Sequence, residues 1–270
     1  MSKLMIAPSG YEAVTALRIE RGQAQSRAES LAEETPIALV YNGISQAVMM
    51  ATPLDLEDFV LGFSLSEGII AHAGELLDIE SVSSERGISM ELRITEARFQ
   101  QLKARRRSLT GRTGCGLCGQ ETLEQAIRPI PKVNSNYSLA PAEVSQAVAH
   151  LSTQQPLNAI TGAVHAAGLW QHSAFLLRED VGRHNALDKL IGAYAWLTTR
   201  DGLVVISSRA SYEMVHKVAT AGFAIVAAIS APTALAVKLA DEAGVCLIGF
   251  TRESRMTVYT HPQRLTGMQA

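Results

Sequence analysis

Short apolar segments alternate with helical segments through the second half of the chain, and this alternation constrains the fold more than any other feature. The predicted strands span residues 174–177, 203–207, 223–230 and 245–250. The predicted helices span residues 185–197, 212–221 and 232–243. Strands separated by helices of about 10–15 residues are typical of βαβ units, in which neighbouring strands run parallel. We therefore expect a largely parallel sheet in this half.

The beginning of the chain has the pattern of extended and hairpin structure instead. Residues 1–34 alternate weakly between apolar and polar and indicate an extended arm. Residues 37–50 predict a hairpin, because the pair Asn42 and Gly43 at its centre readily adopts the positive φ angles of a type I′ turn.

Two helices and a strand are predicted after this hairpin. In the first helix, Thr52 is expected to be the cap, Pro53 suits the first turn, and Gly68 lies beyond the end. Residues 88–94 alternate and predict a strand, after which Thr95 is expected to cap a basic helix.

A segment rich in proline, asparagine and serine, residues 128–141, separates the two patterns. Such a composition is typical of an interdomain linker, and a surface loop has the same composition. We expect an α/β protein of two domains. Residues 1–130 are predicted to form a smaller α+β domain, and residues 131–270 a βαβ domain that binds a cofactor.

Composition restricts the possible functions. Hydrophobic residues make up 47% of the 270 residues and charged residues 19%, as in globular proteins. No apolar run reaches the roughly 18 residues of a membrane span, and residues 1–10 do not resemble an export signal. We therefore expect a cytoplasmic protein with no membrane partner. The net charge of −2 does not favour nucleic-acid binding.

The sharpest chemical signal is a glycine-rich loop at residues 111–119, which carries Cys115 and Cys118. Its glycines leave the thiols with little cover. No acidic residue occurs from residue 97 to residue 120, and the basic residues there are Arg98, Lys103, Arg105, Arg106, Arg107 and Arg112. Positive surroundings favour the thiolate, which is the nucleophilic form of cysteine. The third cysteine, Cys246, has the apolar neighbours of a buried strand residue.

Several chemistries use two cysteines separated by two residues. A structural zinc site needs two more ligands, and the sequence has no second such pair, so we expect no permanently bound metal. Dithiol–disulfide exchange and the transfer of a sulfur atom as a persulfide both fit the loop. The residues alone leave these two nearly tied.

Polar loops follow the predicted strands of the second half, and open α/β sheets bind their ligands at this edge. These loops carry Arg183, Arg209, Arg252 and Arg255, whose guanidinium groups suit phosphate or a planar base. Ordinary helix capping explains any single serine or threonine there. Together, the four loops favour an anionic ligand.

Four other polar residues of this half have simpler interpretations. We expect Asp180 and Asp188 to hold neighbouring basic groups rather than to act in acid–base catalysis. A partly buried histidine with satisfied polar atoms is the preferred interpretation of His165. For His184, a ligand contact and a structural role are equally compatible with the sequence.

Several motifs together resemble the formate dehydrogenase accessory sulfurtransferase family. They lie, in order, at residues 42–44, 61–70, 111–119, 180–185, 207–214, 230–233 and 259–262. The combination of the cysteine loop with the downstream motifs is highly specific, and the resemblance covers roughly residues 33–265.

This resemblance implies a sulfur-transfer activity. Members of the family accept sulfur from a cysteine desulfurase as a cysteine persulfide. They pass it to the molybdenum (or tungsten) bis-molybdopterin guanine dinucleotide cofactor of formate dehydrogenase. By position, Cys115 matches the persulfide intermediate and Cys118 its partner. The implied partners are a cysteine desulfurase, the formate dehydrogenase catalytic subunit, the guanine nucleotide moiety of the cofactor, and a second copy of the chain in a homodimer.

The resemblance also implies where the cofactor binds. The matching stretch consists of Phe250, Thr251, Arg252, Glu253, Ser254 and Arg255. The strand-end loops beside it add Arg183, His184, Ser208 and Arg209 to the predicted cofactor-binding set.

The C-terminal domain of the family resembles the cytidine deaminase fold, which fits the predicted βαβ units. Deaminase chemistry does not follow, because a zinc deaminase needs His-x-Glu and here His165 is followed by Ala166 and Ala167. Two other functions remain open. One is a cofactor-binding chaperone without catalysis, and the other is a dithiol–disulfide oxidoreductase.

Overall fold

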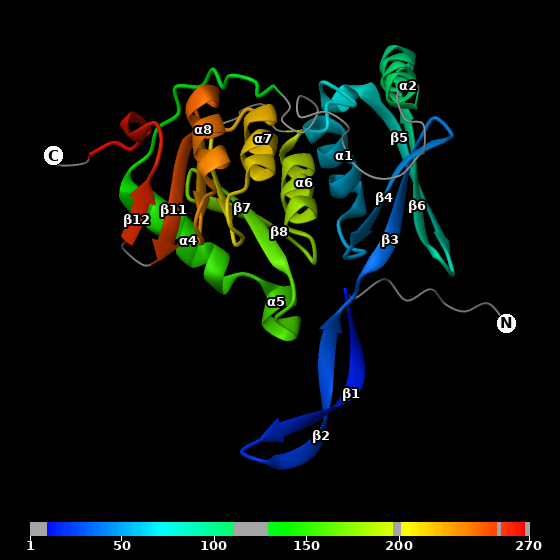
Figure 1. Ribbon diagram of the computed structural model, residues 1–270, viewed down its shortest axis with the longest axis vertical. Coiled ribbons are helices and arrows are strands. Elements are labelled where there is room, and N and C mark those ends of the chain that lie inside the picture. Colours follow the sequence, from blue (N-terminus) through cyan, green and yellow to red (C-terminus); the bar gives the residue numbers. More distant parts are fainter. Residues whose placement is uncertain (1–9, 111–128, 197–200, 253–254, 268–270) are drawn as a thin grey trace.

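The computed structural model describes residues 10–110, 129–196, 201–252 and 255–267. In this part of the chain, two units lie side by side and a narrow arm extends away from them (Figure 1). The larger unit is built on a six-stranded sheet and the smaller on a four-stranded sheet. No helix of the described residues is long and apolar enough to cross a membrane.

The six-stranded sheet belongs to the second half of the chain. Its strands are β7 (His165–Gln171), β8 (Ala174–Asp180), β9 (Leu203–Ile206), β10 (Ile225–Ala228), β11 (Cys246–Arg252) and β12 (Arg255–Val258). Their order across the sheet is β12-β11-β10-β9-β7-β8. Only β9, β10 and β11 pair in parallel, and the other three pairings are antiparallel. The prediction of a largely parallel sheet is therefore wrong in extent, because β7 joins β8 by a tight turn at His172 and Ser173, both with positive φ.

Helices cover this sheet and complete its core. They are α4 (Pro141–Thr153), α5 (Pro156–Thr161), α6 (Arg183–Tyr194), α7 (Tyr212–Thr220) and α8 (Ala234–Ala243), with a short 3-10 helix, η2 (Pro262–Arg264), near the end. The predicted helices correspond to α6, α7 and α8. Apolar residues of the sheet and helices form one buried cluster that includes Leu151, Leu187, Val205 and Val218.

The four-stranded sheet has the order β4-β3-β6-β5. The smaller unit, which contains this sheet, consists of β3 (Thr35–Tyr41), β4 (Ile44–Ala51), α1 (Leu56–Ser66), η1 (Ala73–Glu75), β5 (Leu76–Ser84), β6 (Gly87–Ile94) and α2 (Glu96–Thr110). The predicted hairpin is confirmed, since Asn42 and Gly43 connect β3 to β4 with φ angles of 46° and 81°. Gly68 lies beyond α1 with φ 64°, as expected.

One predicted helix cap, Thr52, is wrong, and the other, Thr95, stands directly before its helix, where its carbonyl accepts from the Phe99 N–H (3.0 Å). The residue before α1 is Asp55, in the left-handed region, and Thr52 is instead fully buried. The Thr52 backbone N–H donates to Asp180 Oδ2 (3.0 Å), and its hydroxyl accepts from the Val181 N–H (3.2 Å). The Thr95 hydroxyl has no hydrogen-bond partner among the described residues, although α2 begins directly after it.

The two units meet where α1 crosses α6. Gly62 of α1 and Gly192 of α6 face each other's backbones: a Cβ on Gly62 would overlap the Asp188 carbonyl, and one on Gly192 would overlap the Asp58 carbonyl. Only glycine allows backbones to approach this closely. The segment 129–140 lies against the larger unit, where the Val133 N–H donates to the Ala243 carbonyl (2.8 Å).

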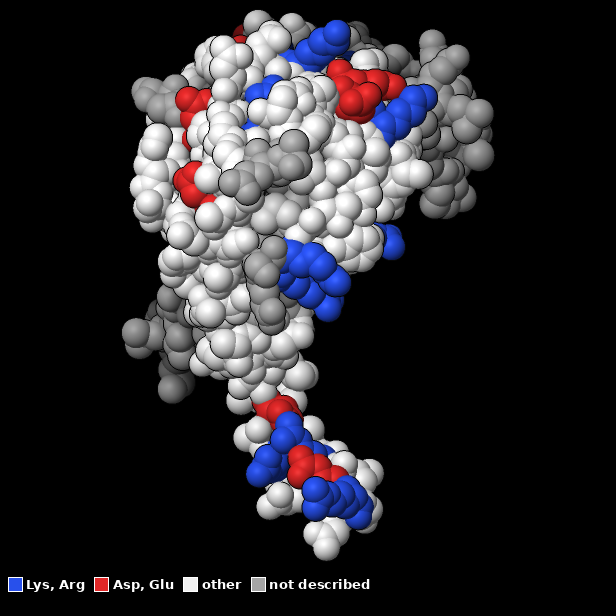
Figure 2. Space-filling model, turned by 90° about the vertical axis from the view of Figure 1, so that its left-hand side faces the viewer, with Lys and Arg blue, Asp and Glu red and all other residues white. Residues whose placement is uncertain are grey.

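The arm consists of β1 (Tyr11–Glu20) and β2 (Gln23–Ala32), paired antiparallel along their full length. It projects beyond both units (Figures 1 and 2). The expectation of an extended arm is confirmed for its described residues, and its form is a two-stranded hairpin.

Candidate functional site

The polar loops that were predicted to hold a ligand meet at one edge of the six-stranded sheet. Three strands of this sheet, β9, β10 and β11, run in the same direction. Strand β8 also runs in this direction, because both β8 and β9 are antiparallel to β7. Neighbouring loops are hydrogen-bonded: the Phe250 N–H donates to the Ser230 carbonyl (3.2 Å), and the Thr233 N–H to the Ala210 carbonyl (3.0 Å). We call residues 181–184, 207–211, 229–233 and 250–252 the polar edge.

Arg183 offers an unused donor at the polar edge. It is the first residue of α6, and its Nε is buried without a hydrogen-bond partner among the described residues. Nearby, His165 begins β7, with Nδ1 3.4 Å from the Ser207 hydroxyl. Burial, and then the charge of Arg183, hold the pKa of His165 below its ordinary value. A cation beside a neutral histidine suits an anionic group of a ligand.

His184 is engaged in a contact between helices. Its Nε2 lies 2.9 Å from Oε2 of Glu213 on α7. Burial lowers the pKa of His184, and the Arg183 and Lys217 charges add to this effect against the opposing influence of Glu213. The sequence left a ligand contact and a structural role equally open for His184. Its contact with Glu213 supports the structural role.

Two predicted binding residues use their hydroxyls within the fold. Ser208 is buried, and its hydroxyl donates to the Arg209 carbonyl (3.1 Å). Thr251 is also buried, and its hydroxyl donates to the Ala228 carbonyl (2.6 Å). The side chain of Arg209, in contrast, is exposed.

Phe250 is the most unusual residue of the polar edge. It is an exposed aromatic residue with φ 52°, a conformation that bulky residues rarely adopt. Such backbone outliers cluster at binding sites. Arg252 is the last residue of β11, Arg255 is the first residue of β12, and the two form a register pair. The remaining predicted residues, Glu253 and Ser254, lie outside the described residues.

Of the three cysteines, the structure describes one. Cys115 and Cys118 lie outside the described residues. Cys246 is fully buried in β11, as predicted, and burial raises the pKa of its thiol to about 12. A thiol of this kind is a poor nucleophile at neutral pH.

Part of the basic charge before the cysteine loop is used in folding contacts. Arg98 of α2 forms an ion pair with Glu75 (2.9 Å), and Nη1 of Arg105 lies 3.5 Å from the Glu67 carbonyl. The sequence of residues 97–120, which has no acidic residue, did not indicate that Arg98 forms an ion pair, because its partner Glu75 lies far away along the chain.

Below the polar edge, Asp180 and Lys189 form a fully buried ion pair of 2.7 Å. The Lys189 ammonium also donates to the Thr52 carbonyl (3.0 Å). Asn185 Nδ2 donates to the Met50 carbonyl (2.8 Å) and to Asp180 Oδ1 (3.0 Å). This network joins α6 to the smaller unit, so Asp180 holds a neighbouring basic group as predicted.

A second buried network joins α1, α6 and α7. The Lys217 ammonium donates to Asp188 (2.9 Å), Glu67 (3.1 Å) and the Ser66 hydroxyl (2.8 Å). Burial alone would lower the pKa of Lys217, but the two carboxylates outweigh it and raise the pKa. The prediction that Asp188 holds a basic group is confirmed.

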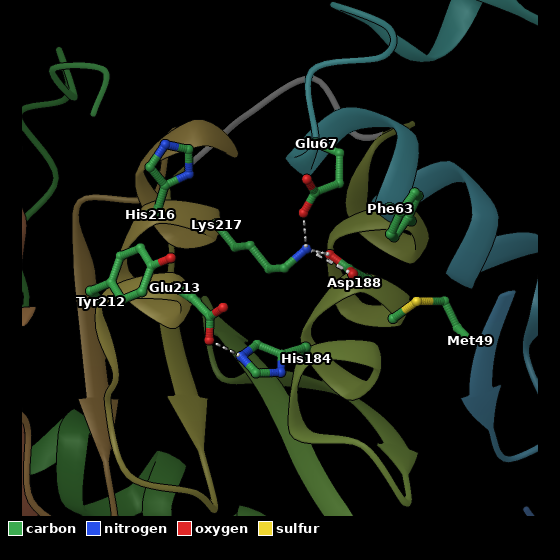
Figure 3. Close-up of a pocket in the computed structure, with 9 residues that line it drawn as sticks. All are labelled: Met49, Phe63, Glu67, His184, Asp188, Tyr212, Glu213, His216 and Lys217. Carbon is green, nitrogen blue, oxygen red and sulfur yellow. Dashed lines mark hydrogen bonds and ion pairs between the residues drawn. The ribbon is translucent and has the colours of Figure 1, made fainter. Parts of the chain in front are cut away.

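This second network lines a pocket of about 190 Å³ between the units (Figure 3). Glu67 and Asp188 point toward the Lys217 ammonium, while Glu213 and His184 close one side (Figure 3). Met49 and Phe63 form the apolar part of the pocket wall. In the part of the chain that the structure describes, no group of three His, Cys, Asp or Glu residues is arranged to hold a metal ion.

Sequence reasoning missed the residues of these networks that lie far apart in the chain. Lys217 and Ser66 come from different units, and no local pattern indicates that they meet. One signal was available: Gly62 and Ser66 are four residues apart on one helix, and small residues at this spacing permit a second helix to pack closely.

Comparisons with known proteins place the chain in one family. The family model described as "FdhD/NarQ family" matches residues 32–266. A solved structure of a protein proposed to be a formate dehydrogenase accessory protein, from Desulfotalea psychrophila, superposes with a TM-score of 0.73 at 26% identity. That superposition covers 94% of this chain and 99% of the other.

Curated relatives match the chain over nearly its full length. A protein of Cupriavidus necator named sulfur carrier protein FdhD is 51% identical over 263 residues, which are 96% of this chain and 91% of the relative. The protein of the same name from Bordetella petrii is 47% identical over 268 residues, 96% of each chain. The one from Xanthomonas oryzae is 50% identical over 256 residues, 93% of this chain and 91% of the relative. This chain therefore belongs to the FdhD/NarQ family.

Proposed function

We propose that this protein is a sulfurtransferase that takes part in the maturation of formate dehydrogenase. The observation that carries the proposal is 44–51% identity, over nearly the whole chain, to proteins named sulfur carrier protein FdhD. In this proposal, a cysteine desulfurase supplies persulfide sulfur. The acceptor is the molybdenum (or tungsten) bis-molybdopterin guanine dinucleotide cofactor, bound as a substrate and destined for the formate dehydrogenase catalytic subunit.

The thiol chemistry falls on Cys115 and Cys118. Cys246 is unsuited to it, because its thiol is buried and protonated at neutral pH. The Cys115 thiolate attacks the outer sulfur of the desulfurase persulfide. The sulfur–sulfur bond of the donor breaks, and the desulfurase cysteine leaves as a thiolate. Such thiols stay reduced in the cytoplasm, where we place this reaction.

Cys118 can act after this transfer in one of two ways. It can accept the outer sulfur from Cys115 and relay it as a second persulfide. Alternatively, it can attack the inner sulfur of the Cys115 persulfide, which releases sulfide and leaves a Cys115–Cys118 disulfide. The second route supplies both electrons that convert the carried sulfur to sulfide, and a cytoplasmic dithiol reductant then has to reduce the Cys115–Cys118 disulfide before the next turnover.

The polar edge is the proposed binding site for the guanine nucleotide arm of the cofactor. Arg183 has a donor without a partner among the described residues, and Arg209 is exposed. Phe250 exposes an aromatic ring on which a planar base can stack. Arg252 and Arg255 lie at the same end of the sheet and suit the charged diphosphate. The predicted residues Ser208 and Thr251 support these loops from below through hydrogen bonds to backbone carbonyls.

Activation of formate dehydrogenase in cells that lack the endogenous protein tests this function. Cys115→Ala is expected to leave the dehydrogenase inactive although it still contains cofactor. Cys246→Ala is the matched control, since it removes a thiol that the proposal does not use, and it should restore activity. A cofactor-binding chaperone without sulfur transfer would also work with the Cys115→Ala variant. Full activation by that variant therefore rejects the proposed transfer.

A further inference from the structure

His165 lies beside the polar edge, and its two ring nitrogens have different surroundings. It is the first residue of β7, which runs antiparallel to β8 and β9, so it stands where those two strands end. Nδ1 of His165 lies 3.4 Å from the Ser207 hydroxyl, which accepts a hydrogen bond from the Ala166 N–H (2.9 Å). Nε2, the ring nitrogen farther from the backbone, has no hydrogen-bond partner among the described residues.

Ser207 decides which ring nitrogen of His165 carries the proton. A serine hydroxyl that accepts one hydrogen bond still has a proton of its own to donate. Within the described part of the chain, Nδ1 of His165 is the acceptor in reach of that proton. Burial, and then the charge of Arg183, lowers the pKa of His165 and so keeps the ring neutral at pH 7. A neutral imidazole has one donor and one acceptor, so Nε2 is a hydrogen-bond donor.

Two other donors of the polar edge have no partner in the part of the chain that the structure describes. One is the buried Nε of Arg183, the first residue of α6. The other is the hydroxyl of Ser211, which directly precedes α7 and is only 9% exposed. The starts of the two helices are adjacent, because His184 of α6 contacts Glu213 of α7 (2.9 Å). Buried polar groups without partners are rare in folded proteins, so donors of this kind at one edge indicate a ligand.

The chemistry of these donors favours a phosphate group. An ionised phosphate accepts hydrogen bonds and binds well to guanidinium groups and to helix N-termini. α6 and α7 have 12 and 9 residues, and the N–H groups of their first turns have no acceptor within the helix. The carboxylates beside these helix starts are held in other contacts, Asp180 with Lys189 (2.7 Å) and Glu213 with His184 (2.9 Å). They therefore leave the three donors available to an anion.

We propose that His165 binds a phosphate group of the guanine nucleotide arm through the proton on Nε2, beside Arg183 and Ser211. This contact belongs to the ligand site of the proposed function and rests on that proposal. The sequence favoured a histidine whose polar atoms are satisfied within the fold. In the structure the two roles use different nitrogens, because Nδ1 contacts Ser207 and Nε2 is left for the ligand. Substitutions that keep one nitrogen at a time therefore separate the two roles.

Two amide variants of the full-length protein make this separation. In His165→Gln the amide nitrogen reaches the position of Nε2, so the donor to the phosphate is kept and the contact with Ser207 is lost. In His165→Asn the shorter amide reaches only the position of Nδ1, so the reverse holds. The matched control is His172→Asn, at the opposite end of β7, because His172 is exposed and its φ of 47° suits asparagine. Urea denaturation checks that all three variants are folded.

Isothermal titration calorimetry then measures the dissociation constants of guanosine diphosphate and of inorganic pyrophosphate. The wild type, His172→Asn and His165→Gln should bind each ligand alike, and His165→Asn should bind both about tenfold more weakly, since a hydrogen bond to a charged group is lost. A histidine that only supports Ser207 predicts the opposite order of the two His165 variants, and that order would overturn the proposal.

Three further results would also contradict the role of His165. Wild-type affinity in His165→Asn, alongside weak binding by Arg183→Gln, would refute this contact and leave the proposed ligand site intact. A loss for guanosine diphosphate without a loss for pyrophosphate would place His165 against the base or the ribose. A wild-type protein that binds neither ligand would remove the ligand site and this contact with it.

Discussion

The ammonium group of Lys189 lies 2.7 Å from Oδ2 of Asp180, and neither side chain is exposed to solvent. Lys189 also donates to the carbonyl of Thr52, which belongs to the other unit. Asp180 and Lys189 therefore hold the two units together, next in sequence to residues 181–184 of the polar edge.

Removing the lysine should strongly destabilise the fold. Lys189→Met leaves the Asp180 carboxylate buried without its cation, which costs about 3–5 kcal/mol in the free energy of unfolding. Urea denaturation at neutral pH measures this loss. Lys238→Met removes an exposed lysine and should change stability by less than about 0.5 kcal/mol. A loss for Lys189→Met as small as that of the control would refute the assigned role.

The contact between α1 and α6 should leave no room for even one added methyl group. In Gly192→Ala, the new methyl group meets the Asp58 carbonyl, and the helices must separate. We expect a loss of at least about 1–3 kcal/mol, typical of overpacked cores, measured by thermal or urea unfolding. Gly74→Ala is the matched control, because its Cβ would lie 3.4 Å from the His72 ring in ordinary contact. Equal stability of the two variants would contradict the close helix crossing.

Stability should fall as the pH decreases from 7 toward 5. Burial lowers the pKa of both His165 and His184 in the folded protein, so the unfolded chain takes up protons first, near pH 6.5. The loss begins near that pH and is complete once the pH is below the folded-state pKa values. His184→Gln should flatten the dependence of the free energy of unfolding on pH. An unchanged slope in this variant would show that His184 is not held neutral.

Guanosine diphosphate should bind at the polar edge. Arg183→Gln removes a charged donor and is expected to weaken binding about tenfold or more, as measured by isothermal titration calorimetry. Phe250→Ala should weaken binding as well, because the stacking surface is lost. Arg86→Gln, in the turn between β5 and β6, should bind like the wild type. Wild-type affinity in both the Arg183 and Phe250 variants would place the nucleotide elsewhere.

The sequence predicted those elements well whose signal lies within a few neighbouring residues. The turn at Asn42 and Gly43 and the helices α6, α7 and α8 follow from turn chemistry and from apolar segments of distinct length. The alternation of strands and helices also placed the polar loops at one edge. The antiparallel strands β7 and β12 were not predicted. Each pairs with the strand next to it in the chain, so no helix separates the two strands and the alternation of strand and helix is missing there.

Contacts between distant segments could not be predicted in the same way. Thr52 looked like a helix cap because threonine followed by proline is a common helix start. The structure instead uses its backbone and hydroxyl to hold Asp180 and Val181, more than 120 residues away. No local pattern in the sequence singles out Lys217, and only the packing of three helices reveals its two carboxylate partners.

Mass spectrometry of the intact protein and its peptides can detect sulfur carried on Cys115. The protein is incubated with a cysteine desulfurase and isotopically labelled cysteine, without reductant, and the Cys246→Ala variant serves as the control. We predict one labelled sulfur atom on the peptide containing Cys115 and Cys118, in both the wild type and the control, and none in Cys115→Ala. If the wild-type protein gains no labelled sulfur, or if Cys115→Ala gains as much as the wild type, Cys115 is not the sulfur carrier.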